Sequence, residues 1–177
     1  MSNLTKEHIL ELLSNMKSVK EDINKLNQLK YSKTNDIDKD EIKVDIYRKQ
    51  LEWERYFKQV KSSFYKVILV MRNAENKALR ELKDEYNISY WERSINTNYI
   101  DITFSPKKDL LSARCTYNDR CGDYHYGKIK VPYDYFNMNE NELIEAHTKW
   151  SINRIKNKYQ KQERKEKLNK IEKNGKD

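Results

Sequence analysis

The sequence predicts an α+β fold that combines a long antiparallel helical hairpin, a three-stranded antiparallel sheet and a C-terminal basic helix. Apolar residues recur at heptad spacing through the first half of the chain, and they alternate with polar residues between positions 98 and 131. Only three glycines and two prolines occur in 177 residues, which favours long elements with few tight turns. We expect residues 1–177 to form a single domain.

The first predicted helix covers residues 5–30 and carries one apolar seam. Its apolar residues are spaced alternately three and four apart, as in a coiled coil: Ile9, Leu12, Met16, Val19, Ile23 and Leu26. Thr5 belongs to the residue types that cap helix N-termini. Residues 31–39 are polar and break the spacing, so they are predicted to connect this helix to the next.

A second, longer helix is predicted from about Asp40 to about Tyr86, so that residues 5–86 form the hairpin. Two apolar series repeat every seven positions along it: Ile46, Trp53, Val60, Val67 and Ala74, and then Phe57, Phe64, Met71 and Ala78. This helix would span roughly 70 Å and the first one roughly 39 Å, so part of the second is left uncovered. Residues 66–71 are apolar on every side, which predicts a covering layer that we assign to residues 98–131.

Residues 98–131 are predicted to form a meander of three antiparallel strands. Ile102 and Phe104 alternate with polar residues in the first strand, and Leu111 and Ala113 do so in the second. The turns are expected at residues 105–109 and 118–122, where proline, glycine, asparagine and aspartate cluster.

The third strand contains a change of step at its glycine. Tyr124 and Tyr126 alternate on one face, whereas Ile129 and Val131 fall on the other. A β-bulge at Gly127 would bring all four side chains to the core face, and we predict such a bulge. It would turn Lys128 and Lys130 outward on the opposite face.

The third predicted helix covers residues 139–177 and ends in a basic tail. Asn139 and Glu142 have the spacing of a capping box, with asparagine in place of serine or threonine. Leu143, His147 and Trp150 are expected to face inward. Beyond residue 156 the helix is almost bare of apolar residues.

The charge of the chain favours anionic partners. The net charge is +8 and the isoelectric point is about 9.2. Residues 156–177 hold nine basic and four acidic side chains, a net of +5. No apolar run of membrane-spanning length occurs, and the N-terminus has no signal-peptide core, so a cytoplasmic protein without a membrane role is expected. The tail also has too few apolar residues to insert into a membrane surface.

The two cysteines predict neither a metal site nor a cofactor site. Cys115 and Cys121 are further apart than paired zinc ligands usually are, and His125 is the only nearby third ligand. A disulfide also fits poorly, because Cys115 is expected in a strand and Cys121 in a turn. Two free thiols are the simpler interpretation. No glycine-rich phosphate loop and no specific catalytic motif occurs in the sequence.

Two groups of residues are candidates for contacts with nucleic acid. The first lies on the predicted outer face of the sheet, where cations could neutralise phosphates and tyrosine could stack on a base: Tyr99, Arg114, His125, Lys128 and Lys130. The second lies in the tail: Lys156, Lys158, Lys161, Arg164 and Lys165. The alternatives are an ordinary solvated sheet face and a tail that only increases solubility.

The leading hypothesis is a non-enzymatic nucleic-acid-binding protein that prefers RNA or single strands to duplex DNA. The main alternative is a protein-interaction or virion-structural coiled-coil module, with a homodimer formed through the hairpin and an interaction patch of Tyr47, Trp53 and Phe57. A lesser alternative is a metal-independent ribonuclease that uses Arg114, His125 and Lys128.

The amino-acid usage suggests an origin. Lysine, asparagine, isoleucine and tyrosine are abundant and alanine is rare, which is typical of coding by an AT-rich genome. In size and style the whole chain resembles small accessory proteins of phages that infect low-GC bacteria. The resemblance implies a host or viral protein complex as a partner. An inhibitor of an RNA-guided defence complex, of the anti-CRISPR kind, is the function that this analogy suggests.

Overall fold

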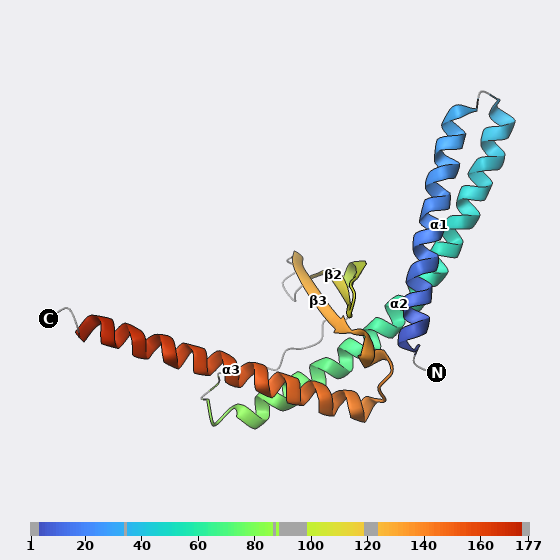
Figure 1. The fold of residues 1–177 in the computed structure, drawn as a ribbon. Coiled ribbons are helices and arrows are strands. Elements are labelled where there is room, and N and C mark those ends of the chain that lie inside the picture. Colours follow the sequence, from blue (N-terminus) through green and yellow to red (C-terminus); the bar gives the residue numbers. More distant parts are fainter. Residues whose placement is uncertain (1–3, 34, 87, 89–98, 119–123, 175–177) are drawn as a thin grey trace. The chain divides into compact units, whose positions relative to one another are not determined.

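A computed structural model describes residues 4–33, 35–86, 88, 99–118 and 124–174, and for residues 99–101, 115–118, 124–126 and 170–174 it describes the backbone alone. The predicted α+β fold is confirmed: the elements are helices α1, α2 and α3, a 3-10 helix η1 and a sheet of strands β1, β2 and β3 (Figure 1). They form two compact units, residues 1–67 with 96–137, and residues 68–95 with 138–177. Helix α2 contributes residues to both units.

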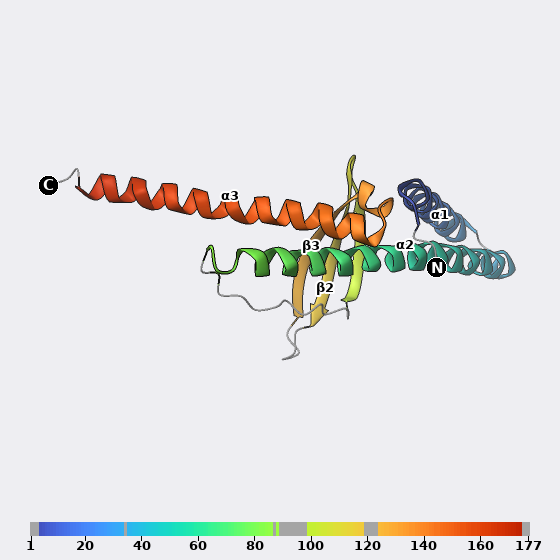
Figure 2. The same ribbon diagram turned by 90° about the horizontal axis from the view of Figure 1, so that it is seen from below.

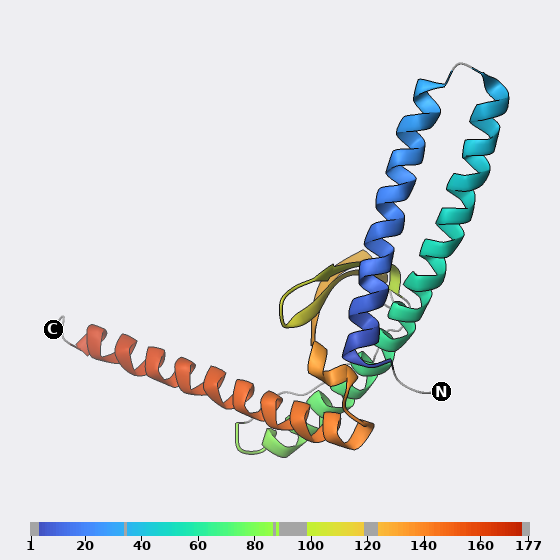
Figure 3. The same cartoon turned by 45° about the vertical axis from the view of Figure 1, so that its right-hand side comes forward.

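The helical hairpin belongs to the first unit. Helix α1 (Lys6–Ser32) runs antiparallel to the N-terminal part of α2 (Asp36–Leu82), and the two lie side by side in Figures 1 and 3. The predicted cap is confirmed, since the hydroxyl of Thr5 accepts a hydrogen bond from the backbone N–H of His8 at 3.4 Å. Five apolar residues of the predicted seams are buried in the hairpin: Ile9, Met16, Val19, Ile46 and Val60.

The connection between α1 and α2 is shorter than predicted. Residues 31–39 were expected to lie outside the helices, but α1 continues to Ser32 and α2 begins at Asp36. The side-chain oxygen of Asn35 accepts a hydrogen bond from the N–H of Ile37 at 3.1 Å. Asp36 and Asp38 then place negative charge in the first helical turn, where the helix dipole favours it. This polar stretch is therefore a helix start. At its other end α2 stops at Leu82, four residues before the predicted boundary.

The sheet completes the first unit. Strands β1 (Tyr99–Pro106), β2 (Leu110–Asn118) and β3 (Tyr124–Pro132) are antiparallel in the order β1-β2-β3 (Figure 2). The first turn is where it was predicted, and it is closed by a hydrogen bond from the N–H of Lys107 to the carbonyl of Leu110 at 2.9 Å. Residues 119–123, which include Cys121 and most of the second predicted turn, lie outside the described residues.

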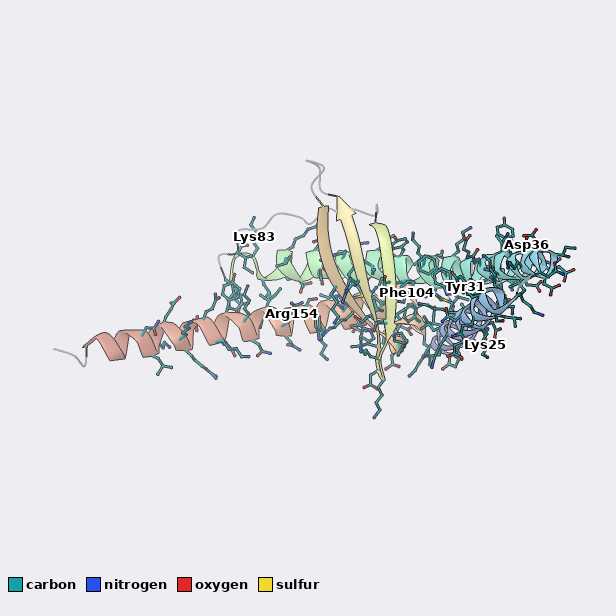
Figure 4. All side chains as sticks on the ribbon, turned by 90° about the horizontal axis from the view of Figure 1, so that it is seen from above. Lys25, Tyr31, Asp36, Lys83, Phe104 and Arg154 are labelled. Carbon is teal, nitrogen blue, oxygen red and sulfur yellow. The ribbon has the colours of Figure 1, made fainter. Side chains whose placement is uncertain are left out.

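One face of the sheet packs against α2. The Phe104 ring lies 5.6 Å from the ring of Phe57 and 5.2 Å from that of Phe64, centroid to centroid. Figure 4 labels Phe104 on its strand. The same face buries four more apolar side chains of the strands: Ile102, Leu111, Ala113 and Val131. Phe57 and Phe64 precede residues 66–71 on α2, so these contacts leave the predicted cover of residues 66–71 by the sheet untested.

The predicted bulge at Gly127 is wrong. The pairing of β2 with β3 runs without a shift from Leu110↔Pro132 to Asn118↔Tyr124. A regular alternation already places Ile129 and Val131 in the core-facing series, so no extra residue is needed. The prediction assumed that Tyr124 and Tyr126 need the core, although tyrosine tolerates a half-solvated position. The one irregularity of the described ladder lies between Tyr99 and Asp101 in β1.

Helix η1 (Tyr133–Phe136) follows β3 directly and closes the first unit at the start of α1. Tyr133 and Phe136 are buried, at 1% and 3% exposed. The backbone N–H of Lys6 donates to the side-chain oxygen of Asn137 at 2.7 Å, and the Lys6 ammonium lies 3.2 Å from the Asp134 carboxylate.

The second unit pairs α3 (Glu140–Asn174) with the C-terminal part of α2, as Figures 1 and 2 show. The predicted capping box is confirmed: Asn139 N–H donates to Glu142 Oε2 at 2.8 Å, and Glu142 N–H donates to Asn139 Oδ1 at 3.0 Å. Ala74 and Ala78 of α2 are fully buried, and the Thr148 hydroxyl donates to the Ala74 carbonyl at 3.4 Å. Residues this small allow the two helices to approach closely.

Trp150 does not face inward as predicted. It is 47% exposed, whereas Leu143, His147, Thr148 and Ser151 are buried. Successive residues of a helix are rotated by about 100°, so His147 and Ser151 lie on one side of α3. Trp150 lies at the edge of this buried side. The small side chain of Thr148 contacts Ala74, and an indole would not fit between α2 and α3 at the helix separation that this contact requires.

Candidate nucleic-acid interface

The sheet brings three cationic residues together on its face away from α2. Across β2 and β3, Arg114 lies opposite Lys128 and Ser112 lies opposite Lys130. Residues opposite each other in an antiparallel pair have Cα atoms about 4.5–5.5 Å apart and project on the same face. Arg114, Lys128 and Lys130 are all exposed, and we call them the sheet triad. They are neighbours in an unbroken ladder, so the grouping does not need the bulge that was predicted to create it.

Two other residues predicted for this face are not brought together with the sheet triad. The backbone register pairs His125 with Tyr117, in the alternating series opposite to that of Arg114 and Lys128. Tyr99 also pairs with Tyr117, beyond the irregularity in β1. Their side chains lie outside the described residues. The register therefore does not place His125 in the series of the two cations, and the ribonuclease alternative stays a prediction.

The basic residues of α3 separate by face of the helix. At about 100° per residue, five cations lie within about 80° of the direction of Trp150. We call these residues the α3 basic face, and all of them are exposed: Arg154, Lys158, Lys161, Arg164 and Lys165. Glu163 and Glu166 lie on the opposite side, about 140–160° from Trp150. These two acidic residues therefore do not interrupt the α3 basic face.

Lys156 does not belong to the α3 basic face, although it was predicted with its neighbours. It points about 120° away from Trp150 by helical position. Its ammonium lies 3.7 Å from the carboxylate of Glu85, in the turn that follows α2. Tyr86 of that turn meets Tyr159 of α3, with ring centroids 4.9 Å apart. Lys156 thus takes part in packing inside the second unit.

Trp150 and Arg154 are the residues that the sequence analysis missed. The indole of Trp150 stacks on the His147 ring, with ring centroids 5.0 Å apart and an angle of 21° between the ring planes. The guanidinium of Arg154 lies 5.2 Å from the indole centroid. His147 is 2% exposed. An aromatic residue followed by cations at i+4, i+8 and i+11 (Trp150, Arg154, Lys158 and Lys161) was readable in the sequence as one helical stripe. The assignment of Trp150 to the core hid it.

Glu75 of α2, which forms an ion pair with Arg72, lies next to His147 beneath Trp150. The Glu75 carboxylate lies 3.5 Å from His147 Nε2 and 2.7 Å from the Arg72 guanidinium. Burial by itself would raise the pKa of the Glu75 carboxyl. The hydrogen bond with His147 and the positive charge of Arg72 outweigh burial, so this pKa lies below its ordinary value of 4.5. The carboxylate is therefore ionised at neutral pH.

Glu75→Gln is expected to lower the free energy of unfolding at pH 7 by about 1–3 kcal/mol, because a charge-assisted hydrogen bond is lost. A carboxyl with a lowered folded pKa stabilises the fold above its unfolded pKa and loses this contribution as the pH falls through the folded value. The wild type should therefore lose more stability than the variant as the pH falls below about 4.5. Urea unfolding at several pH values between 7 and 3 measures the difference, and parallel curves for the two proteins would refute the assignment.

The predicted interaction patch divides between two sides of α2. Trp53 and Phe57 stack on each other at 5.0 Å and line a groove of about 800 Å³ between α1, α2 and β1, with Met16 and Phe104 among its other walls. Tyr47 is 61% exposed on the other side of the helix, and three further apolar residues are exposed beside it: Ile37, Val44 and Leu51. We call Ile37, Val44, Tyr47 and Leu51 the α2 outer stripe.

Within the part of the chain that is described, no group of three or more histidine, cysteine or acidic side chains could hold a metal ion. Cys115 lies in β2 opposite Gly127 in β3, and Cys121 lies outside the described residues, so the state of the two thiols stays a prediction. None of the described helices is both long and apolar enough to cross a bilayer.

No protein-family model matches the chain, and comparisons with curated proteins and with solved structures find no match.

Proposed function

We propose that the protein binds nucleic acid without an enzymatic activity, and that it prefers RNA or single strands to duplex DNA. The observation that carries the proposal is the α3 basic face. It gathers five exposed cations along about 17 Å of one helix, with the neighbouring acids on the opposite side. A stripe of this kind can neutralise successive phosphates and release their counterions, which is the main source of sequence-independent affinity.

The sheet triad supports the same proposal from the first unit. Arg114 and Lys128 are register neighbours, and the exposed hydroxyl residues Thr103 and Ser105 share their face of the sheet. Hydroxyl groups and arginine are common donors to phosphate oxygens. The chain therefore offers a cationic surface in each unit. The compositional resemblance to phage accessory proteins extends the proposal to RNA that belongs to a host nucleoprotein defence complex.

The proposal is tested by titrating the purified full chain into labelled single-stranded RNA at several salt concentrations. The expected result is binding at low salt whose affinity falls linearly on a double-logarithmic plot, with a slope of about −0.7 for each neutralised phosphate. A duplex DNA of equal length is expected to bind more weakly. If the protein binds neither the single-stranded RNA nor single-stranded or duplex DNA at low salt, the proposal fails.

A second candidate function, self-association through the hairpin, is favoured by the α2 outer stripe. Its residues follow the spacing 7-3-4 and lie roughly 180° around the helix from the buried residues Ile42 and Val60. In an antiparallel pair centred between Val44 and Tyr47, these two residues would meet across the two-fold axis. Glu41 would then face Arg48 of the second copy, which is a complementary pair of charges.

Val44→Glu is expected to abolish dimers, because it buries a charge at the centre of the short apolar contact. The molar mass of the wild type and of the variant is measured by light scattering over a range of concentrations, since four residues predict a weak dimer. Lys43→Glu, one position away on α2, is the matched control and should leave the dimer in place. A wild type that stays monomeric at the highest concentration excludes this candidate.

A further inference from the structure

We propose that Trp150 and Arg154 form a stacking site for an unpaired base of single-stranded nucleic acid, next to the cations of the α3 basic face. The inference rests on the proposed function and specifies its ligand as a strand with exposed bases. A single exposed tryptophan would be unremarkable on a protein surface. Here the indole begins a stripe in which Arg154, Lys158, Lys161 and Lys165 follow along the same side of the helix.

The Trp150 ring is held in a defined orientation from below. His147, which is buried, stacks on it at 5.0 Å and 21°. His147 in turn lies 3.5 Å from Glu75, and Glu75 lies 2.7 Å from Arg72. The indole is nevertheless 47% exposed, so its ring is supported on one side by the buried His147 and is covered on the other only by the exposed guanidinium of Arg154. A base that stacks there loses little freedom of the protein side chain, because the ring is already ordered.

Arg154 lies over the indole at a position from which a base can displace it. His147 and Arg154 are three residues before and four residues after Trp150, so they approach the ring from opposite directions along the helix. An exposed cation–π contact corresponds to about a 2- to 5-fold preference. Stacking of a base on an aromatic side chain is worth about 5- to 150-fold. A base therefore replaces the guanidinium on the ring, and the released Arg154 can bind the adjacent phosphate.

The polar residues beside the ring suit a nucleotide. Asn153 and Asn157 line the shallow hollow on α3 together with Trp150, Arg154, Lys158 and Lys161. An amide side chain offers both donors and an acceptor, so it can pair with the edge of an unpaired base. In a duplex the base faces are stacked on their neighbours and are closed to the indole. The site is thus expected to discriminate single strands from duplexes of the same charge.

The test compares Trp150→Ala, Trp150→Phe and the control Leu168→Ala, all in the full chain. Leu168 is also an exposed apolar residue on the Trp150 side of α3, at 60% exposed, but it lacks a ring. Each protein is titrated with a short single-stranded RNA, with the same sequence as single-stranded DNA, and with the RNA duplex. Circular dichroism checks that helix content is unchanged. The two single-stranded arms decide whether the strand is RNA, DNA or either.

Trp150→Ala is expected to weaken binding of single strands about 5- to 150-fold while duplex binding changes less than about 2-fold, with Trp150→Phe intermediate and Leu168→Ala like the wild type. Equal losses on single strands and duplexes, or no loss on either, would overturn the stacking site. The proposed function fails separately, if the wild type binds none of the three nucleic acids at low salt.

Discussion

Replacing Lys158, Lys161 and Lys165 together by glutamine is expected to weaken binding of single-stranded RNA about 100-fold at about 0.1 M salt. Each lost phosphate contact removes about 0.7 from the slope of log affinity against log salt, so three contacts remove about 2. All three side chains are exposed, and they occupy one side of α3, so the change should leave the helix in place. Affinity is measured by fluorescence anisotropy across a salt series.

The matched control is a second triple variant of the same helix. Lys149, Lys156 and Lys167 point about 100–120° away from Trp150, on the other side from the α3 basic face. Their replacement by glutamine changes the net charge by the same amount and should alter affinity only a few-fold. Equal losses in the two triple variants would show that total charge governs binding and that the arrangement on α3 does not.

Phe64→Ala is expected to lower the free energy of unfolding by about 3–5 kcal/mol, the largest effect of any single substitution considered. Phe64 is fully buried, and its ring meets Phe104 edge-on at 5.2 Å, so it joins α2 to the sheet. The truncation removes this aromatic contact and leaves a cavity in the first unit, which the rigid surroundings refill only in part. Guanidinium unfolding followed by far-ultraviolet circular dichroism measures the change.

Leu69→Ala is the control for Phe64→Ala. It also removes a large apolar side chain from α2, but Leu69 is 38% exposed, so the expected loss is under about 1 kcal/mol. Similar losses in the two variants would mean that the contact between Phe64 and Phe104 does not anchor the sheet. Far larger destabilisation by Phe64→Ala is what the packing predicts.

The parts of the fold that depend on local patterns were predictable from the sequence. The a/d seam placed α1 within two residues of its observed ends, and Thr5 and the pair Asn139–Glu142 marked two helix starts. These signals are local, because a cap uses residues three positions apart. Asn35 and Asp36 gave the same kind of local signal for the start of α2. The segment was nevertheless predicted to be a connection, because it is polar.

The errors concern residues whose place depends on distant partners. Tyr126 and Trp150 were assigned to the core because they are aromatic. The regular register puts Tyr126 in the series of Lys128, and the contact of Thr148 with Ala74 leaves Trp150 at the edge of the helix pair. Neither the register of a third strand nor the separation of two helices follows from residue type alone.

The candidate surfaces were only partly predictable from the sequence. The placement of Arg114 and Lys128 on one face of the sheet was expected, although for a wrong geometric reason, and the tail cations were identified as a group. The structure adds their division by helix face, which separates Lys156 from Lys158. Helical periodicity alone predicts this division once the helix is known to continue unbroken through residue 165.

If α3 binds nucleic acid as proposed, the exposure of its C-terminal half couples the order of this helix to binding. All residues from Gln160 to Asn169 are exposed, so none of the described residues of the unit packs closely against this stretch of helix. An unsupported helix of this length is marginal in water, and like charges at Lys161 and Lys165, four residues apart, oppose it further. A polyanion that neutralises those charges shifts the local helix–coil equilibrium toward helix, so warming, which favours coil, should weaken binding of the nucleic-acid strand at temperatures below the melting of either unit.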